Sequence, residues 1–182
     1  MRLMEGKLGR GGVRLFEFKP HMDDRGLFIG MPIAQRDYYD LPEFVECNVS
    51  CSAAGVIRGL HFQTRAFAQA KLVTCLRGSL LDVFVDVRPE SPTFGEWGSR
   101  LLTGLSGEAI FIPEGFAHGF QALHDNTLLQ YHVSKRYEPN YQGGIRWDDP
   151  TLDIDWNKAY QPILSSRDRE LPTLDDWKRT LA

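Results

Sequence analysis

The segment Ser79–Arg88 restricts the fold more than any other feature of this sequence, because its residues alternate with a period of two. The side chains that would face one way are apolar: Leu81, Val83, Val85 and Val87. The side chains that would face the other way are Asp82, Phe84 and Asp86. Such alternation predicts a β-strand with polar groups on one face. The preceding Lys71–Leu76 is also strand-like, and Arg77-Gly78 predicts a turn, so we expect a β-hairpin.

Similar short segments recur roughly every ten residues, separated by turns rich in glycine and proline. The further strand candidates are Val13–Phe18, Leu27–Met31, Glu46–Cys51, Gly55–Leu60, Ala109–Ile112, Gly119–Leu123 and Thr127–His132. Only Ala34–Asp40 and Thr173–Leu181 look helical. This spacing predicts an all-β sandwich or barrel. We expect residues 1–182 to form one domain, with the segment after Trp156 packed around the barrel.

Charge and composition exclude several classes of function. The chain has 182 residues and a net charge of -3, so it offers no basic excess to a nucleic acid. No stretch approaches the roughly 18 apolar residues of a membrane-spanning helix, and the first residues lack the apolar core of an export signal. An odd number of cysteines without a Cys-x-x-Cys pair is typical of reduced thiols. We therefore expect a cytoplasmic protein with no membrane or nucleic-acid partner.

The spacing around His118 matches one of the two motifs of the cupin fold, a small jelly roll also called the double-stranded β-helix. The motif residues, with five, one and two residues between them, are Gly107, Pro113, Gly115 and His118. The other cupin motif normally supplies His-x-His and a glutamate that bind a metal. Here it reads His61-x-Gln63, and Lys71 takes the place of the glutamate. Because an ammonium repels a divalent cation, we predict a site without a metal or cofactor.

A cation beside a neutral imidazole suits the removal of a proton from a carbon next to a carbonyl group. Lys71 would stabilise the developing enolate oxygen, and His61 would accept the proton. Arginines nearby would fit an anionic, phosphate-bearing substrate. Inverting a carbon also requires an acid on the opposite face of the substrate, and Tyr131 and Tyr137 are the candidates.

Six parts of the sequence resemble the dTDP-4-dehydrorhamnose 3,5-epimerase family, in the family's order. They are RGLHFQ (58–63), QAKLV (69–73), DVFVDVRPESPTFGEW (82–97), IPEGFAHGF (112–120), the pair Tyr131 and Tyr137, and LSSRD (164–168). The resemblance implies a metal-free, cupin-type jelly roll that epimerises C3, C5 or both in a nucleotide-linked 4-keto-6-deoxyhexose. It also implies a homodimer with swapped strands and a place in deoxysugar biosynthesis for a surface polysaccharide such as an O-antigen.

The resemblance further implies a role for each matching residue. The implied catalytic residues are His61 as base, Asp168 as its carboxylate partner, Lys71 beside the ketone oxygen and Tyr131 as acid. Among the implied substrate-binding residues, Arg25 and Arg58 would contact the diphosphate, Asn48 the nucleotide, and Tyr137 would stack on the base. The other implied substrate-binding residues are Glu46, His118, Gln142 and Arg167. No metal ligand is implied. Asp82 and Asp86 would fit either an inner network or a solvated face, and we assign them no role.

Four positions depart from the family's pattern. Gly30 replaces a glutamate, Glu46 a glutamine, Gln142 a glutamate and Arg167 a lysine. The first two lie where the pyrimidine would be recognised. Thymine offers an N3–H donor to a carboxylate, whereas cytosine offers its N4 amino group. We hypothesise that these changes switch the nucleotide carrier from dTDP to CDP. The alternative is a local rearrangement around Gly30 with thymine still bound.

Three other functions fit these residues less well. A 3,4-ketoisomerase of the same fold would need no opposing acid, so Tyr131 argues against it. A non-catalytic sugar- or nucleotide-binding cupin would be expected to lose His61 or Asp168. A metal-dependent cupin oxygenase or isomerase conflicts with Lys71 and Gln63.

Overall fold

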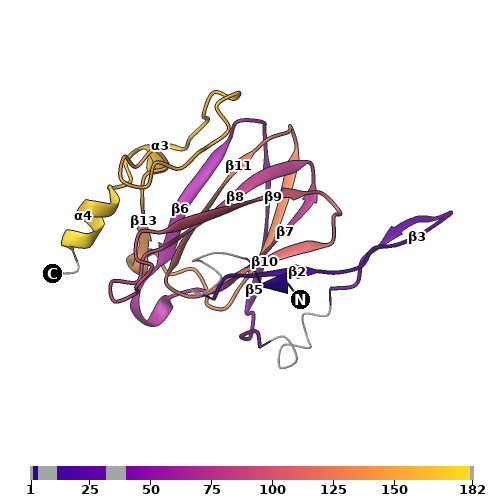
Figure 1. Cartoon of the computed structure of the whole chain (residues 1–182), viewed down its shortest axis with the longest axis horizontal. Helices are drawn as coiled ribbons and strands as arrows, with labels where there is room; N and C mark the ends of the chain where they lie inside the picture. Colours follow the sequence, from indigo (N-terminus) through magenta and orange to yellow (C-terminus); the bar gives the residue numbers. More distant parts are fainter. Residues whose placement is uncertain (1, 4–11, 32–39, 181–182) are drawn as a thin grey trace.

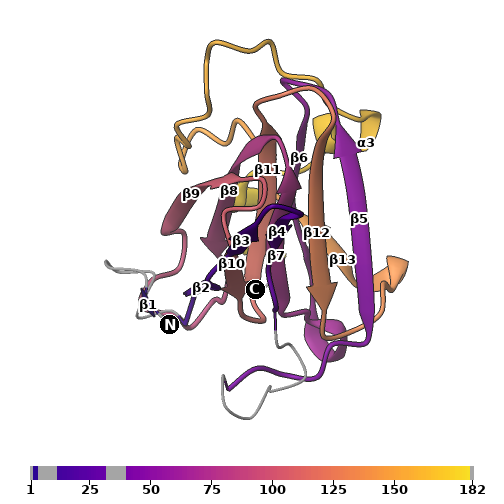
Figure 2. The same ribbon diagram turned by 90° about the vertical axis from the view of Figure 1, so that its right-hand side faces the viewer.

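The computed structural model describes residues 2–3, 12–31 and 40–180, and it is built around two antiparallel sheets that pack face to face (Figures 1 and 2). The six-stranded sheet has the order β1 (Arg2–Leu3), β2 (Arg14–Glu17), β10 (Glu108–Ile112), β7 (Lys71–Arg77), β12 (Thr127–Val133) and β5 (Glu46–Ser52). The five-stranded sheet has the order β13 (Gln142–Gly144), β6 (Ile57–Gln63), β11 (Phe116–Ala122), β8 (Ser79–Asp86) and β9 (Trp97–Thr103). This architecture confirms the predicted all-β, cupin-type jelly roll.

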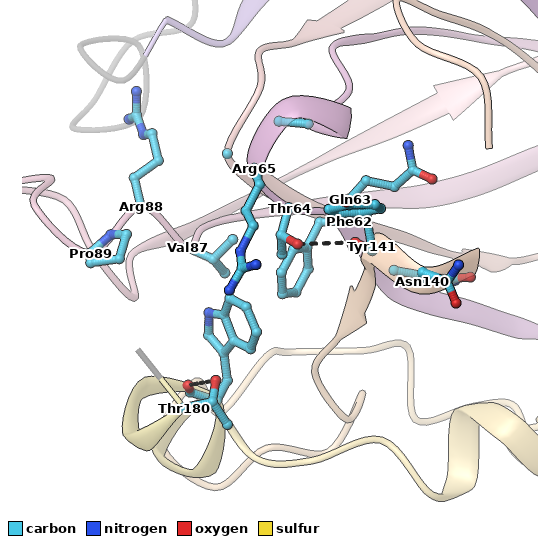
Figure 3. Close-up of a pocket in the computed structure, with 14 residues that line it drawn as sticks. Phe62, Gln63, Thr64, Arg65, Val87, Arg88, Pro89, Asn140, Tyr141 and Thr180 are labelled. Atoms are coloured by element: carbon cyan, nitrogen blue, oxygen red, sulfur yellow. Dashed lines mark hydrogen bonds between the residues drawn. The ribbon is translucent and has the colours of Figure 1, made fainter. Parts of the chain in front are cut away.

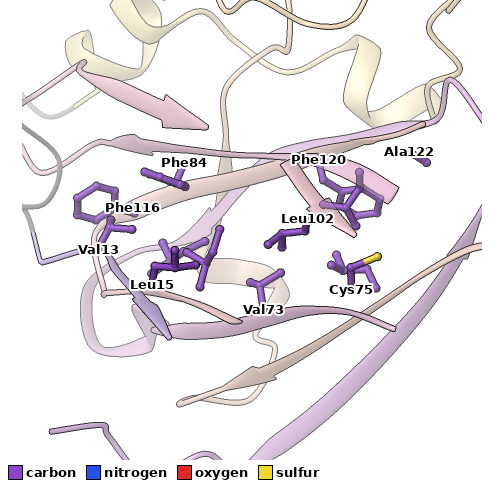
Figure 4. Packing of buried hydrophobic residues seen from close by; sticks show 13 residues of the cluster. Val13, Leu15, Val73, Cys75, Phe84, Leu102, Phe116, Phe120 and Ala122 are labelled. Carbon is purple, nitrogen blue, oxygen red and sulfur yellow. The ribbon is translucent and has the colours of Figure 1, made fainter. Parts of the chain in front are cut away.

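Apolar side chains from both sheets fill the space between them (Figure 4). This core includes Phe84 of β8 and Ile110 of β10, each 0% exposed, and Phe116 of β11, which is 1% exposed. Burying a side chain of this size stabilises a fold by about 1.5–3 kcal/mol. The core occupies one part of the sandwich, and the polar cavity described below occupies another.

Strand β8 is buried on both faces, although its alternation predicts one polar face. Val83 and Val85 point out of the sandwich and belong to a second apolar cluster with Trp156 and Leu174 of the C-terminal segment. Asp82 lies on the inner face and is 0% exposed. The polar face of this strand is therefore turned into the interior, where its carboxylates need partners.

The predicted hairpin between Lys71–Leu76 and Ser79–Arg88 is wrong. Strand β7 pairs with β10 and β12, whereas β8 pairs with β11 and β9 in the other sheet. The chain crosses between the sheets at Gly78, whose φ is +78° and where an added Cβ would lie 2.5 Å from Thr127 Oγ1. Only glycine meets both requirements easily, so the Arg77-Gly78 signal marks a corner between sheets and not a hairpin turn.

The remaining strand predictions correspond to β2, β4, β5, β6, β10, β11 and β12, with shifted ends. The pattern missed β1, β3, β9 and β13. The predicted helix at Thr173–Leu181 contains α4 (Leu174–Arg179), and three unpredicted elements are α3 (Ser166–Arg169) and the 3-10 helices η1 (Arg65–Phe67) and η2 (Pro139–Tyr141). The predicted helix at Ala34–Asp40 lies outside the described residues except for Asp40. None of the helices in the described ranges is long and apolar enough to cross a membrane.

A two-stranded arm projects from the body of the molecule (Figure 1). It consists of β3 (His21–Asp23) and β4 (Gly26–Phe28), which pair only with each other. Met22 and Phe28 on this arm are 79% and 69% exposed. Two large apolar side chains at this exposure mark the arm as a surface that another molecule can cover.

Candidate active site

A cavity of about 310 Å³ lies between the two sheets and gathers most of the predicted site residues. The predicted residues that line it are Arg58 and His61 of β6, Lys71 of β7, His118 of β11, Tyr131 of β12, Tyr137 and Gln142. Pairing of β6 with β11 places His61 directly opposite His118 in the five-stranded sheet. Lys71 and Tyr131 come from the six-stranded sheet, so the cavity has cationic and titratable groups on both walls.

His61 is held by a carboxylate that reaches it from α3. Its Nε2 lies 2.6 Å from Asp168 Oδ1, and Ser165 Oγ donates to Asp168 Oδ2 at 2.9 Å. Burial would raise the pKa of Asp168, but the hydrogen bond and charge of His61 and the hydroxyl of Ser165 outweigh it, so this pKa is lowered. An ionised Asp168 accepts a hydrogen bond from the Nε2–H of His61. The Nδ1 of His61 then carries the free lone pair that a base requires.

Lys71 is buried next to this pair. Its side-chain Nζ donates to the main-chain carbonyl of His61 at 3.3 Å. Burial lowers the pKa of Lys71 to about 8, and the negative charge of Asp82 opposes this shift. Lys71 therefore remains protonated at neutral pH with little competing solvent, which strengthens its interaction with a developing oxyanion.

Asp82, to which the sequence assigned no role, forms a second histidine–aspartate pair. Its Oδ1 lies 2.7 Å from His118 Nε2, and the side chain is completely buried. Its Oδ2 has no hydrogen-bond partner in the described part of the chain. The alternation of β8 places Asp82 on the same face as Phe84. This shared face was the signal in the sequence that Asp82 could point into the interior. Asp86, in contrast, binds Arg88, Ser91 and Thr93 at the end of the strand.

Tyr131 faces the cavity from the wall opposite His61, beside the edge strand β5. The β12–β5 register places Asn48 directly across from Tyr131, and Asn48 Nδ2 donates to Glu46 Oε1 at 3.0 Å. Burial raises the pKa of Tyr131; Arg58 opposes the shift and Glu46 adds to it. The phenol therefore keeps its proton over the neutral pH range and is available as an acid.

The structure leaves some predicted residues at the rim or away from the cavity. Arg167 of α3 is exposed and donates to Tyr137 Oη at 3.4 Å. Arg25 lies on the projecting arm, where its guanidinium, 90% exposed, binds Asp23 at 2.6 Å. Gly30 follows the same arm. The residues expected to read the diphosphate and the base are thus only partly assembled within one chain.

Gln63 occupies the position of a cupin metal ligand but is used by the protein itself. Its Nε2 donates to the carbonyls of Phe67 and Arg136, and its Oε1 accepts from the main-chain N–H of Glu138 at 2.6 Å. Among the described residues, no group of three or more His, Cys, Asp or Glu side chains is arranged to hold a metal ion. Gln63 therefore fixes the chain around the cavity wall.

Comparisons with known proteins agree on one family. The sequence model for dTDP-4-dehydrorhamnose 3,5-epimerase matches residues 9–176. A curated dTDP-4-dehydrorhamnose 3,5-epimerase from Methanothermobacter thermautotrophicus is 42% identical over 177 residues, covering 94% of this chain and 91% of that protein.

Solved structures give the same result. An rmlC epimerase from Mycobacterium tuberculosis superposes with a TM-score of 0.90 at 39% identity, covering 99% of this chain and 92% of the other. A 3'-monoepimerase from Streptomyces bikiniensis, solved with dTDP-quinovose, has a TM-score of 0.86 at 34% identity and covers 93% and 87% of the two chains.

Proposed function

The chain belongs to the dTDP-4-dehydrorhamnose 3,5-epimerase family, and from this premise we propose how its cavity epimerises a nucleotide-linked 4-keto-6-deoxyhexose. The enzyme is a nucleotide-sugar epimerase, an isomerase. The observation that carries the mechanism is that His61 and Tyr131 line one cavity from opposite sheets. A base on one face of the sugar and an acid on the other is the arrangement that inversion of a carbon requires.

In the proposed reaction, His61 removes the proton from a carbon adjacent to the C4 ketone. The electron pair of the broken C–H bond forms the enolate, whose oxygen is stabilised by the Lys71 ammonium. Tyr131 then donates its phenolic proton to the opposite face of the same carbon. Proton exchange with water returns His61 to its neutral form and Tyr131 to its protonated form. Asp168 stabilises the imidazolium formed in the first step.

We assign substrate binding to the polar residues around this centre. Arg58 of the cavity wall and Arg167 at the rim are placed to bind the diphosphate, and the exposed ring of Tyr137 to stack on the nucleotide base. His118 and Gln142 line the cavity beside the sugar position.

Arg25 is proposed to act in a second subunit. The arm that carries it projects from the body of the molecule (Figure 1), and its Met22 and Phe28 are exposed. We propose a homodimer in which this arm crosses to the partner and places Arg25 at the partner's diphosphate. Light scattering is expected to give a dimer. Met22→Asp together with Phe28→Asp is expected to give a monomer with little activity; a fully active monomer would contradict the swap.

The nucleotide carrier is proposed to be dTDP or CDP, and Glu46 to decide between them. Glu46 and Asn48 are hydrogen-bonded to each other on β5, next to Tyr131. The relatives named above are dTDP-sugar enzymes, whereas a carboxylate at Glu46 suits the amino group of cytosine. Replacing Glu46 with Gln is expected to shift preference toward the dTDP-sugar; an unchanged preference would disprove this role of Glu46.

The decisive experiment is proton exchange in D2O, followed by NMR, with dTDP- and CDP-4-keto-6-deoxyglucose supplied separately. Deuterium at C3 and C5 would establish a 3,5-epimerase, and deuterium at C3 alone a 3-epimerase. The His61→Asn variant is expected to lose exchange at both carbons. If the variant exchanged as fast as the wild type, His61 would not be the base.

We also propose that the chain acts as one domain in the cytoplasm, in deoxysugar biosynthesis for a surface polysaccharide. The packing of Trp156 and Leu174 onto the five-stranded sheet supports a single folding unit. The three free cysteines, two of them exposed, are consistent with a reducing compartment.

A further inference from the structure

A second cavity, of about 720 Å³, lies on the outer side of the five-stranded sheet under α4, and the reaction does not use it. Its wall is formed by the ends of β6 and β8, η1, the η2–β13 segment and α4 (Figure 3). Cavities that bind small molecules usually have volumes of about 300–1,000 Å³. Phe62, Gln63 and Gln142 line both this cavity and the catalytic one, so the two share a wall.

Three aromatic side chains, Phe62, Tyr141 and Trp177, line the cavity. Phe62 and Trp177 pack edge to face with ring centroids 4.9 Å apart, and Tyr141 packs at a tilt against Phe67 with ring centroids 4.5 Å apart. Val87 adds an aliphatic surface. Such a wall favours the flat, apolar body of an aromatic ligand.

The cavity lining carries two guanidinium groups, those of Arg65 and Arg88. Arg65 extends from η1 across the opening toward α4 (Figure 3), and it makes no ion pair or side-chain hydrogen bond within the described ranges. The Nε1 of Trp177 is buried and has no acceptor in the same part of the chain. The described residues of the lining include no Asp or Glu, and the other cation, Arg88, is already paired with Asp86. This wall therefore complements a negative charge.

The backbone supports a binding role for Arg65. Its φ is +57°, in the left-handed region that residues other than glycine rarely adopt. Residues held in this region are found preferentially at ligand sites and switches. The exposed side chain of Arg65 extends over the cavity (Figure 3).

We propose that this cavity is a second binding site, for a small organic anion with an aromatic body, in which Arg65 binds the charge and Phe62, Tyr141 and Trp177 enclose the ring. The ligand would press on the wall shared with the catalytic cavity through Phe62 and Gln142. The site is separate from the nucleotide-sugar site, and the proposal does not depend on the reaction assigned above.

Isothermal titration of the full-length protein with phenyl phosphate tests this site, in the presence of saturating dTDP and CDP to occupy the catalytic cavity. We expect saturable binding of one phenyl phosphate per chain. Arg65→Gln is expected to weaken it by about tenfold, since a charge-assisted bond is lost. Trp177→Phe, which keeps an aromatic ring and removes the N–H donor, is expected to weaken it by roughly threefold.

Arg169→Gln is the matched control, because Arg169 is an exposed arginine of α3 that lines neither cavity. It is expected to bind phenyl phosphate like the wild type. Absence of saturable binding in the wild type would overturn the proposal. Equal weakening by Arg65→Gln and Arg169→Gln would also overturn it, since attraction would then be general to the surface.

Discussion

Two histidine–aspartate pairs with nearly the same geometry lie at one cavity, but they differ in their access to water. His61 Nε2 lies 2.6 Å from Asp168, and His118 Nε2 lies 2.7 Å from Asp82. The His61 side chain is 32% exposed, whereas His118 is 8% exposed and Asp82 is 0% exposed. Asp168 also accepts a hydrogen bond from Ser165, whereas Asp82 Oδ2 has no partner in the described residues.

The difference in exposure indicates that the same histidine–aspartate hydrogen bond serves a different purpose in each pair. The His61–Asp168 pair lies where substrate and water can exchange protons with it. It therefore suits a base that must give up its proton again in each catalytic cycle. The Asp82–His118 pair is sealed in, and the charge of Asp82 raises the pKa of Lys71 against the effect of burial. In the proposed mechanism the outer pair moves a proton, whereas the negative charge of the inner pair helps to keep Lys71 protonated.

The largest expected effect is that of breaking the outer pair with Asp168→Asn. An amide at this position can no longer stabilise the imidazolium or fix the Nε2–H tautomer of His61. We expect kcat to fall by about 10²- to 10⁴-fold, the usual range for loss of acid–base catalysis. Asp155→Asn, on an exposed carboxylate, serves as the control. Wild-type kcat in a folded Asp168→Asn protein would show that His61 does not need its partner.

The next effect is a loss of activity above about pH 8, where the pKa of Lys71 lies. Deprotonation removes the cation that stabilises the enolate, so the rate of C3–H exchange should decline through this range. Lys71→Arg keeps a positive charge at all accessible pH values. Any activity that remains in this variant should therefore be lost only at a higher pH than in the wild type. A rate that stays constant to pH 10 would exclude Lys71 as the oxyanion partner.

The stability of the fold is expected to rise over the pH range in which the rate of exchange falls. The pKa of Lys71 is lower in the folded protein than in the unfolded chain, so between about pH 8 and pH 10.5 the unfolded chain binds more protons. The free energy of unfolding should therefore rise with pH relative to a Lys71→Met variant. Urea unfolding of the two proteins at pH 7 and pH 10 measures this difference. A difference independent of pH would mean that Lys71 is not buried as a cation.

A smaller effect should follow from breaking the inner pair with Asp82→Asn. Removing this negative charge lets burial lower the pKa of Lys71 further, so the alkaline limit of the rate should move below about pH 8. Asp168→Asn should leave that limit in place, which separates the two pairs. If both variants moved the limit equally, the division of roles between the pairs would be wrong.

The smallest effect is expected from Ser165→Ala. Ser165 Oγ donates to Asp168 and accepts from the Asp168 main-chain N–H at 3.1 Å, so it both orients the carboxylate and begins α3. We expect a loss of about threefold to tenfold in kcat, in line with a net contribution of about 0.5–1.5 kcal/mol from one hydrogen bond. Ser165→Thr should restore the rate, because it keeps the hydroxyl. Equal loss in both variants would point to the helix start and not to the carboxylate.

Alternation and turn residues are local signals, so they predicted an all-β sandwich or barrel and most of its strands, and the motifs and the family resemblance implied the jelly roll. The local signals failed where pairing depends on distant segments. The Arg77-Gly78 turn was predicted to close a hairpin, but β7 and β8 lie in different sheets. A glycine with a positive φ fits a hairpin turn and a corner between two sheets equally well. Which of the two forms depends on the strands that pair with the flanking segments.

For the site, the sequence by itself determined which residue types are present and which motifs carry them, and so indicated His61, Lys71, Tyr131 and Asp168. The tertiary structure alone decided the role of Asp82, because the burial of a carboxylate depends on what covers its strand. It also decided that Arg25 lies on the projecting arm and does not line the cavity of its own chain. Distances across a sandwich arise from packing between segments far apart in sequence, and no local pattern encodes them.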